Sequence, residues 1–124
     1  MKRFFIMMFA MLSVCMTAMA QNVEVLYFHG KQRCKTCMAI EKETKAIVQG
    51  LKGKAKLSVI DISTPKGKKL AQKYKVSWSS LYIVSGKGKN EKAENMTRFA
   101  FSNALRNAEG FRKELKSRIL NTNK

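Results

Sequence analysis

The sequence has little of what would cross-link a chain or pass it repeatedly through a membrane. It contains three cysteines, one histidine and a single proline among 124 residues. A small secreted domain held together by disulfides would scatter four or more cysteines along its length, so that class is excluded. Long apolar runs do not occur after the first 20 residues, and neither do repeats or low-complexity linkers. The composition therefore predicts one domain with one core.

The one long apolar run stands at the start of the sequence. A basic pair at 2–3 precedes an apolar stretch at 4–14, and the small-residue pattern "AMA" follows at 18–20. This order is typical of a secretory signal peptide. The apolar stretch is shorter than the ~20 residues of a spanning helix, which argues against a retained anchor. We predict a bacterial signal peptide at 1–20 and a periplasmic or otherwise extracytoplasmic domain at 21–124.

Cys34 and Cys37 are the cysteines of this predicted domain, and a C-x-x-C pair has three common uses: redox exchange, metal binding and structural cross-linking. Closing so small a loop restrains the unfolded chain little, so cross-linking is a weak explanation. With only His29 in addition, the chain falls short of the four ligands of a closed zinc site. Two thiolates can still hold Cu(I) or a trivalent metalloid. For redox exchange we predict no cofactor, because the cysteines carry the electrons.

Hydrophobic periodicity divides the predicted domain into alternating strands and helices. Runs of β-branched and aromatic residues predict strands, and apolar residues three and four apart predict helices. Thr64 before Pro65 predicts one helix start, and Asn107 predicts another. The expected elements are a strand at 23–28, a helix at 35–51, a strand at 55–63, a helix from 65, a strand from 79 that ends in a hairpin turn at 86–90, a strand at 94–101 and a helix from 107. The order is β-α-β-α-β-β-α.

The cysteine pair lies where the first strand passes into the first helix. At a helix N-terminus the free N–H groups and the helix dipole favour a thiolate. We therefore expect Cys34 to be exposed and activated, and Cys37 to lie beneath it and resolve mixed disulfides. Lys31, Arg33 and Lys35 add positive charge around Cys34. Stabilising the thiolate stabilises the reduced form, so we expect a relatively oxidising pair.

These features carry a resemblance to a known superfamily. The strand, the C-x-x-C at the helix start, the element order and "YKVSWSSLYIV" resemble thioredoxin-like domains. More narrowly, "YFHGKQRCKTCMAIEKET" is similar to small bacterial secreted thioredoxin-like proteins labelled as an arsenic-operon and nitroreductase-subunit family. The resemblance implies an α/β fold with a mixed four-stranded sheet flanked by helices. It also implies that Cys34 is the attacking cysteine and Cys37 the resolving one.

The loop before the third strand departs from the thioredoxin pattern. Thioredoxins carry a cis-proline there, and this chain has Ser80 in its place. A cis bond before a non-proline residue costs about 2.5–4 kcal/mol, so we expect a trans peptide. By the resemblance, Trp78, Ser79 and Ser80 form a substrate loop. Trp78 is either a substrate contact or packing at the core edge, and the Ser80 hydroxyl either hydrogen-bonds the thiolate or caps the turn.

A second departure concerns the buried acid that thioredoxins place beneath the cysteine pair. The first strand offers only Glu24, which is ten residues before Cys34 and too far along the strand. His29 is the nearest titratable residue. It is interpreted either as a proton acceptor or source of positive charge, or as a turn residue whose imidazole hydrogen-bonds the backbone.

Positive charge far exceeds negative charge, with 25 Lys and Arg against 8 Asp and Glu and a formal net charge of +17. This is either a plain solvated surface or one that attracts an anionic envelope surface or an acidic partner protein. No nucleic-acid recognition motif accompanies it, so we expect no nucleic acid. The prediction is a secreted thiol–disulfide oxidoreductase acting on protein or small-molecule thiols and disulfides. The alternative is a non-enzymatic soft-metal or metalloid-binding module that uses the same two thiols.

Overall fold

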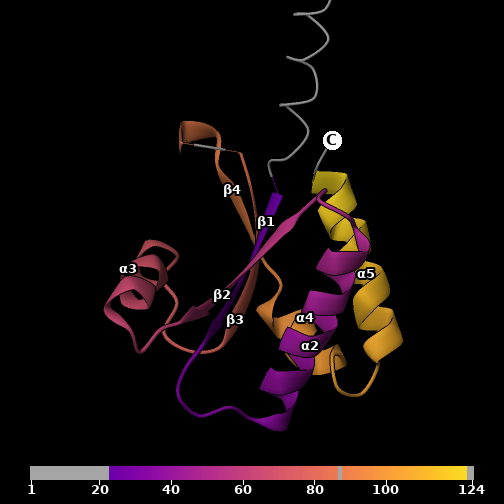
Figure 1. Ribbon diagram of the computed structural model, residues 1–124, viewed down its shortest axis with the longest axis horizontal. Coiled ribbons are helices and arrows are strands. Elements are labelled where there is room, and N and C mark those ends of the chain that lie inside the picture. Colours follow the sequence, from indigo (N-terminus) through magenta and orange to yellow (C-terminus); the bar gives the residue numbers. More distant parts are fainter. Residues whose placement is uncertain (1–22, 87, 123–124) are drawn as a thin grey trace, which may run out of the picture.

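The strand β1 (Val23–His29) lies inside the sheet because its side chains are apolar on both faces. A computed structural model of the protein describes residues 23–86 and 88–122 (Figure 1), and the predicted signal peptide lies outside them. After β1, the elements are α2 (Lys35–Gly50), β2 (Lys56–Asp61), α3 (Pro65–Lys73), β3 (Ser80–Ser85), the 3₁₀ turn η1 (Gly88–Asn90), β4 (Lys92–Asn95), α4 (Thr97–Asn103) and α5 (Ala108–Thr122).

The strands form one mixed sheet in the order β2-β1-β3-β4. β1 pairs in parallel with β2, and the chain crosses between them through α2. β3 runs antiparallel to both of its neighbours, β1 and β4. The mixed four-stranded sheet expected from the sequence is therefore confirmed. Its register pairs Phe28, near the end of β1, with Ser80 at the start of β3. The loop before β3 therefore lies at the same end of the strands as the cysteine pair, which follows β1.

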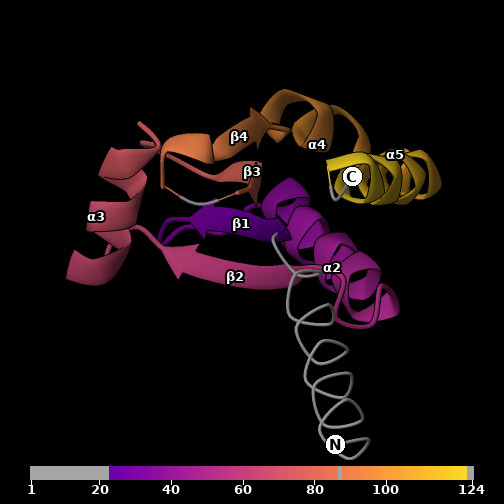
Figure 2. The same ribbon diagram turned by 90° about the horizontal axis from the view of Figure 1, so that it is seen from above.

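Helices cover both faces of the sheet. In Figure 2, α3 lies on one side, and α2, α4 and α5 lie together on the other. Val25 and Tyr27 point into the larger core beneath α2, α4 and α5. Leu26 and Phe28 point into the smaller core, which α3 covers. This alternation explains why β1 reads as a continuous apolar run, since a strand buried on both faces has no polar side.

The predicted fourth strand is present but its range, 94–101, is wrong. The strand β4 covers Lys92–Asn95, and most of the predicted range belongs to the helix α4, which the predicted element order lacks. Met96 and Ala100 are buried at a spacing of four, and Ala104 continues the same stripe. An apolar spacing of four fits a helix, yet it also falls on one side of a strand, so alternation alone could not separate the two. The Oδ1 of Asn95 accepts a hydrogen bond from the Thr97 N–H at 2.9 Å, which forms a turn between the end of β4 and the start of α4, and Met96 and Ala100 are buried in the larger core.

The helices α3 and α5 begin directly after the capping residues expected from the sequence, Thr64 and Asn107. The Thr64 hydroxyl accepts a hydrogen bond from the Gly67 N–H at 3.0 Å at the start of α3. Asn107 Oδ1 accepts from the Gly110 N–H at 3.2 Å at the start of α5. The inner face of α5 is fully buried at Phe111, Leu115 and Ile119. Within the described part of the chain, no helix has both the length and the hydrophobicity to cross a bilayer.

Candidate functional site

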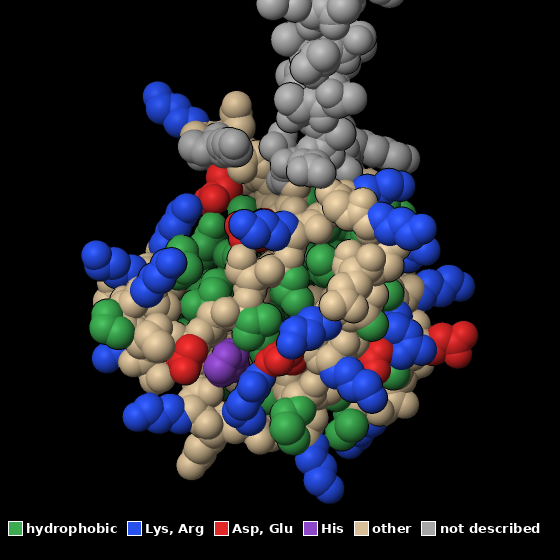
Figure 3. Space-filling view, in the orientation of Figure 1, with side chains coloured by type: hydrophobic (Ala, Val, Ile, Leu, Met, Phe, Trp, Pro, Cys, Tyr) green, Lys and Arg blue, Asp and Glu red, His purple; other side chains and the backbone are tan. Residues whose placement is uncertain are grey.

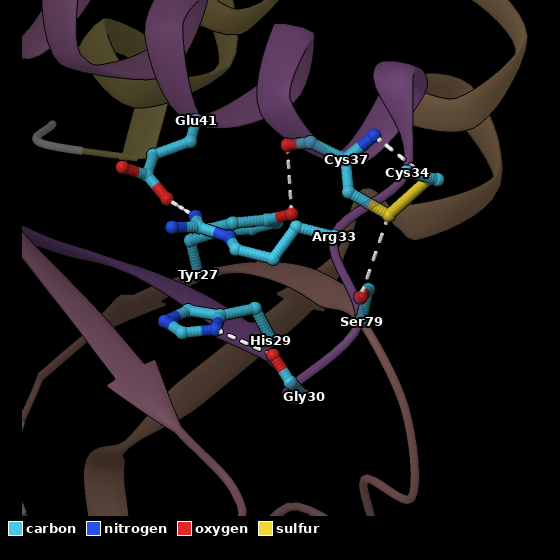
Figure 4. Close-up of a disulfide and its surroundings, with 8 residues drawn as sticks. All are labelled: Tyr27, His29, Gly30, Arg33, Cys34, Cys37, Glu41 and Ser79. Atoms are coloured by element: carbon cyan, nitrogen blue, oxygen red, sulfur yellow. Dashed lines mark hydrogen bonds and ion pairs between the residues drawn. A yellow bond between two sulfur atoms is a disulfide. The ribbon is translucent and has the colours of Figure 1, made fainter.

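Cys34 is the residue before α2, and its sulfur caps the helix. Its backbone is extended (φ −76°, ψ 165°), and its Sγ accepts a hydrogen bond from the Cys37 N–H at 3.0 Å. The two cysteines form a disulfide (Figure 4) with Cα atoms 5.0 Å apart, within the usual range for this bond. Cys34 is exposed, whereas Cys37 is buried. Cys34 therefore offers the accessible sulfur.

Positive charge at this end of α2 comes from the backbone and from side chains. Lys31, Arg33 and Lys35 are exposed, and the first turn of the helix carries no acid. Arg33 forms an ion pair with Glu41, whose carboxylate also lies 3.5 Å from the Lys45 ammonium. Figure 4 shows the Arg33 side chain directed toward Glu41 rather than toward the sulfurs. The charge of Arg33 is therefore shared with Glu41, and the charge-tuning role of Lys31, Arg33 and Lys35 stays a prediction.

Tyr27, not a carboxylate, lies beneath the disulfide. Its hydroxyl donates a hydrogen bond to the Cys37 carbonyl oxygen at 2.8 Å, and its ring is fully buried. Burial raises the pKa of Tyr27 above its ordinary value, while Arg33 and a hydrogen bond with Ser79 act in the opposite direction. Glu24 lies elsewhere on β1, where it accepts a hydrogen bond from Ser58. Sequence reasoning missed Tyr27, although its position on the α2 face of β1 follows from strand alternation.

His29, at the end of β1, contacts the backbone. Its Nδ1 lies 3.0 Å from the Gly30 carbonyl oxygen, and its ring centroid lies 6.1 Å from that of Tyr27. In Figure 4 the imidazole points to the Tyr27 side of the strand and away from the sulfurs. On the neighbouring strand, Asp61 pairs with His29 in register, and hydrogen bonds from Ser63 hold the pKa of that carboxyl below its usual value. The geometry matches the turn interpretation of His29.

The loop before β3 faces the disulfide through Ser79. The Oγ of Ser79 lies 3.6 Å from the Sγ of Cys37. The Ser80 hydroxyl instead donates to the Trp78 carbonyl oxygen at 3.1 Å, so it caps the turn. No peptide bond in the described residues is cis, so the bond before Ser80 is trans, as expected. Trp78 is 66% exposed and stacks on Phe101 with centroids 6.0 Å apart.

Basic side chains outnumber acidic ones on the surface of the protein. Figure 3 shows Lys and Arg spread over the visible face, with few acids among them. Five glutamates of the described residues form ion pairs with Lys or Arg: Glu41, Glu43, Glu91, Glu94 and Glu114. In the part of the chain that the structure describes, no three His, Cys, Asp or Glu side chains gather as a metal-binding group. The soft ligands at the site are the two cysteine sulfurs.

Comparison with known proteins identifies the fold. No protein-family model matches the sequence, and no curated protein matches it. A thioredoxin from Thermus thermophilus has 19% sequence identity and a TM-score of 0.51, covering 82% of this chain and 78% of that one. The Trx4 domain of ERdj5 has 17% identity and a TM-score of 0.49, covering 80% and 84%. A malarial protein has 22% identity and a TM-score of 0.46, covering 66% and 94%. The chain has a thioredoxin-like α/β fold that carries a C-x-x-C disulfide at the N-terminus of α2.

Proposed function

We propose that this protein is a thiol–disulfide oxidoreductase that acts outside the cytoplasm. The observation that carries the proposal is the position of the disulfide, with exposed Cys34 capping α2 and buried Cys37 below it. A partner thiol can reach one sulfur, and the other sulfur is the leaving group. The thioredoxin-like fold supports the same function. Cys34 and Cys37 are the catalytic residues in this proposal.

The exchange conserves electrons between the two pairs. A partner thiolate attacks the Sγ of Cys34 and displaces Cys37 as a thiolate, which forms a mixed disulfide. A second thiolate of the partner attacks the partner's sulfur in that bond and displaces Cys34 as a thiolate. The partner dithiol thereby loses two electrons and two protons and becomes a disulfide. The cysteine pair gains both electrons, and the protons pass to the cysteines or to solvent. The reverse sequence reduces a partner disulfide, with Cys34 attacking.

A neutral hydroxyl lies at the Sγ of Cys37, whereas the Sγ of Cys34 lies at the positive end of α2. A Cys34 thiolate would keep the hydrogen bond from the Cys37 N–H and face the positive end of α2, beside Lys31 and Lys35. A Cys37 thiolate would accept a hydrogen bond from the Ser79 hydroxyl. Tyr27 holds the Cys37 carbonyl and fixes this turn of the helix. Both thiolates are therefore stabilised without a carboxylate beneath the pair.

The setting and the partners are part of the proposal. The leader-like segment at 1–20 supports export to the periplasm or another extracytoplasmic space. There the partners we propose are protein or small-molecule thiols and disulfides. The narrower similarity of "YFHGKQRCKTCMAIEKET" to the secreted arsenic-operon and nitroreductase-subunit group supports membership of a small exported group. It supports no particular substrate.

Cys37→Ser tests the proposal against the soft-metal alternative. This variant keeps Cys34 as an attacking thiol but cannot resolve a mixed disulfide, and it removes one of the two soft ligands. We expect Cys37→Ser, mixed with an oxidised model protein, to form a stable adduct on Cys34 that intact mass spectrometry detects. The control variant Cys34→Ser should form little or none. Redox exchange is refuted if neither wild type nor Cys37→Ser reacts with disulfides while reduced wild type holds stoichiometric Cu(I) or As(III).

A further inference from the structure

A groove lies beside the disulfide, on the side of the loop that precedes β3. It has a volume of about 480 Å³ and is lined by this loop, the start of β3, the end of β4 and the outer side of α4. We call it the Trp78 groove, after the residue that forms its main wall. Its size falls in the range of pockets that bind small ligands or a few side chains.

The Trp78 groove and the disulfide share the loop that precedes β3. Trp78 and Ser80 line it, and Ser79, which lies between them in the chain, has its Oγ 3.6 Å from the Sγ of Cys37. The indole of Trp78 stacks on Phe101 with an interplanar angle of 15°, so the two rings form a broad apolar wall. An aromatic wall left this exposed is typical of a surface that a partner covers.

Both charged residues that line the groove are basic. Lys75 and Arg98 stand on its rim, and no Asp or Glu lines it among the described residues. The ion pairs formed within residues 23–86 and 88–122 use other cations. Lys75 has a left-handed backbone (φ 57°), a conformation that Gly and Asn adopt more readily. The groove therefore combines an apolar wall with two positive charges.

We propose that the Trp78 groove binds an acidic segment of a partner protein, next to the partner cysteine that reacts with Cys34. This inference rests on the proposed function and names its partner class. The loop of Ser79 and Trp78 joins the disulfide to the groove, so a carboxylate near that cysteine in the partner chain would lie on the side where Lys75 and Arg98 stand. An apolar neighbour packs on Trp78. A groove can enclose a peptide, whereas a flat membrane surface cannot enter it. The attraction of a membrane would depend on the summed positive charge of the whole surface and not on this groove.

Trp78 is the only tryptophan in the sequence, so its fluorescence reports on the groove without any redox chemistry. The probe is a ten-residue peptide with two glutamates near a serine that replaces the cysteine, and the control peptide has glutamine in their place. The groove variant is Lys75→Asn with Arg98→Gln. The matched control is Lys52→Asn with Lys116→Gln, which removes the same charge elsewhere. Lys52 shares the left-handed backbone (φ 48°) and follows the far end of α2.

At about 0.01 M ionic strength, we expect the acidic peptide to change Trp78 emission saturably and to bind about fivefold more tightly than the glutamine peptide. The groove variant should lose this preference, and the matched control should keep it. Equal losses in both variants would show a general charge effect and overturn the inference. So would a Trp78 response to anionic lipid vesicles or oxidised glutathione that exceeds the response to the peptide. If the groove binds as expected but Cys37→Ser captures no disulfide, the proposed function fails and the groove alone remains.

Discussion

Replacing Tyr27 by Phe isolates the hydroxyl beneath the disulfide, because phenylalanine fills the same space. In the structure this hydroxyl donates to the Cys37 carbonyl at 2.8 Å, and the ring is fully buried. A hydrogen bond of this kind contributes about 1 kcal/mol, and Tyr27→Phe opens no cavity. We therefore expect the free energy of unfolding of the oxidised protein to fall by about 1 kcal/mol at neutral pH. Tyr27→Ala, which removes the whole ring, should cost about 3–5 kcal/mol.

The pH dependence gives Tyr27→Phe a second signature. Burial raises the pKa of Tyr27 above its ordinary value of 10.0. Above that value the unfolded chain has lost this proton while the folded protein keeps it, so the wild type loses stability as the pH rises through the folded-state pKa. The variant has no such group. The stability difference between the two proteins should therefore shrink above about pH 10, by at most about 1.4 kcal/mol per pH unit.

Guanidinium unfolding of the oxidised proteins, followed by far-UV circular dichroism, measures both effects at neutral pH and at about pH 10.5. All other residues are the same in the two proteins, so their contributions to the pH dependence cancel in the difference. Exchange with dithiothreitol should change little, because the hydroxyl contacts a carbonyl and not a sulfur. The reasoning is refuted if the difference in stability stays constant with pH. A folded Tyr27→Phe that no longer exchanges thiols would instead make the hydroxyl part of the chemistry.

Three further predictions follow from single contacts. Hydrogen bonds from Ser63 lower the pKa of the Asp61 carboxyl below its ordinary value of 3.8, so Asp61 stabilises the folded protein above that pH and this stabilisation is lost in more acidic solution. Asp61→Asn should therefore make the free energy of unfolding depend less on pH in acid. A Cβ at Gly67 would lie 1.8 Å from the Asp61 carbonyl oxygen, so Gly67→Ala should cost about 2 kcal/mol or more, whereas Gly50→Ala, with open space around it, should not destabilise. In the reduced protein, the rate of Cys34 alkylation by iodoacetamide should rise with a midpoint below about pH 8.5, and a midpoint at that value would contradict its activation.

Most of the fold could be predicted because its elements have one unambiguous signal each. β1 has an uninterrupted apolar run at 25–28. The helices α3 and α5 begin at the capping residues Thr64 and Asn107, which accept hydrogen bonds from nearby N–H groups. The segment at 94–101 could not be predicted because its apolar residues satisfy the periods of both a strand and a helix. There the choice depends on the Asn95 side chain and on burial of Ala100 against other helices, which are tertiary effects.

Part of the candidate site could likewise be predicted from the local sequence, and part of it depends on contacts between distant segments. Cys34 and Cys37 are only three positions apart in the sequence, so the motif and its helix start could be recognised from the local sequence. The residues that contact Cys37 come from elsewhere in the chain, Tyr27 from β1 and Ser79 from the loop before β3. The pairing of Phe28 with Ser80 brings this loop to the cysteines. Pairing of β1 with β3 is a long-range property that the sequence does not state. For the same reason the ion pair that draws Arg33 toward Glu41 was not predictable from the local cluster of cations.

The two departures from the thioredoxin pattern have a common physical consequence. The groups that the structure places against Cys37 are hydroxyls, from Ser79 at its sulfur and from Tyr27 at its carbonyl. Tyr27 donates to the carbonyl and holds this turn of α2 in place, so the hydroxyl that can donate to the sulfur of Cys37 is that of Ser79. A donor stabilises a leaving thiolate, whereas a carboxylate at the same place would accept a proton from the resolving thiol. If the proposed exchange holds, this arrangement favours opening of the disulfide by partner thiols over reduction of partner disulfides, which is the direction that positive charge around Cys34 also favours.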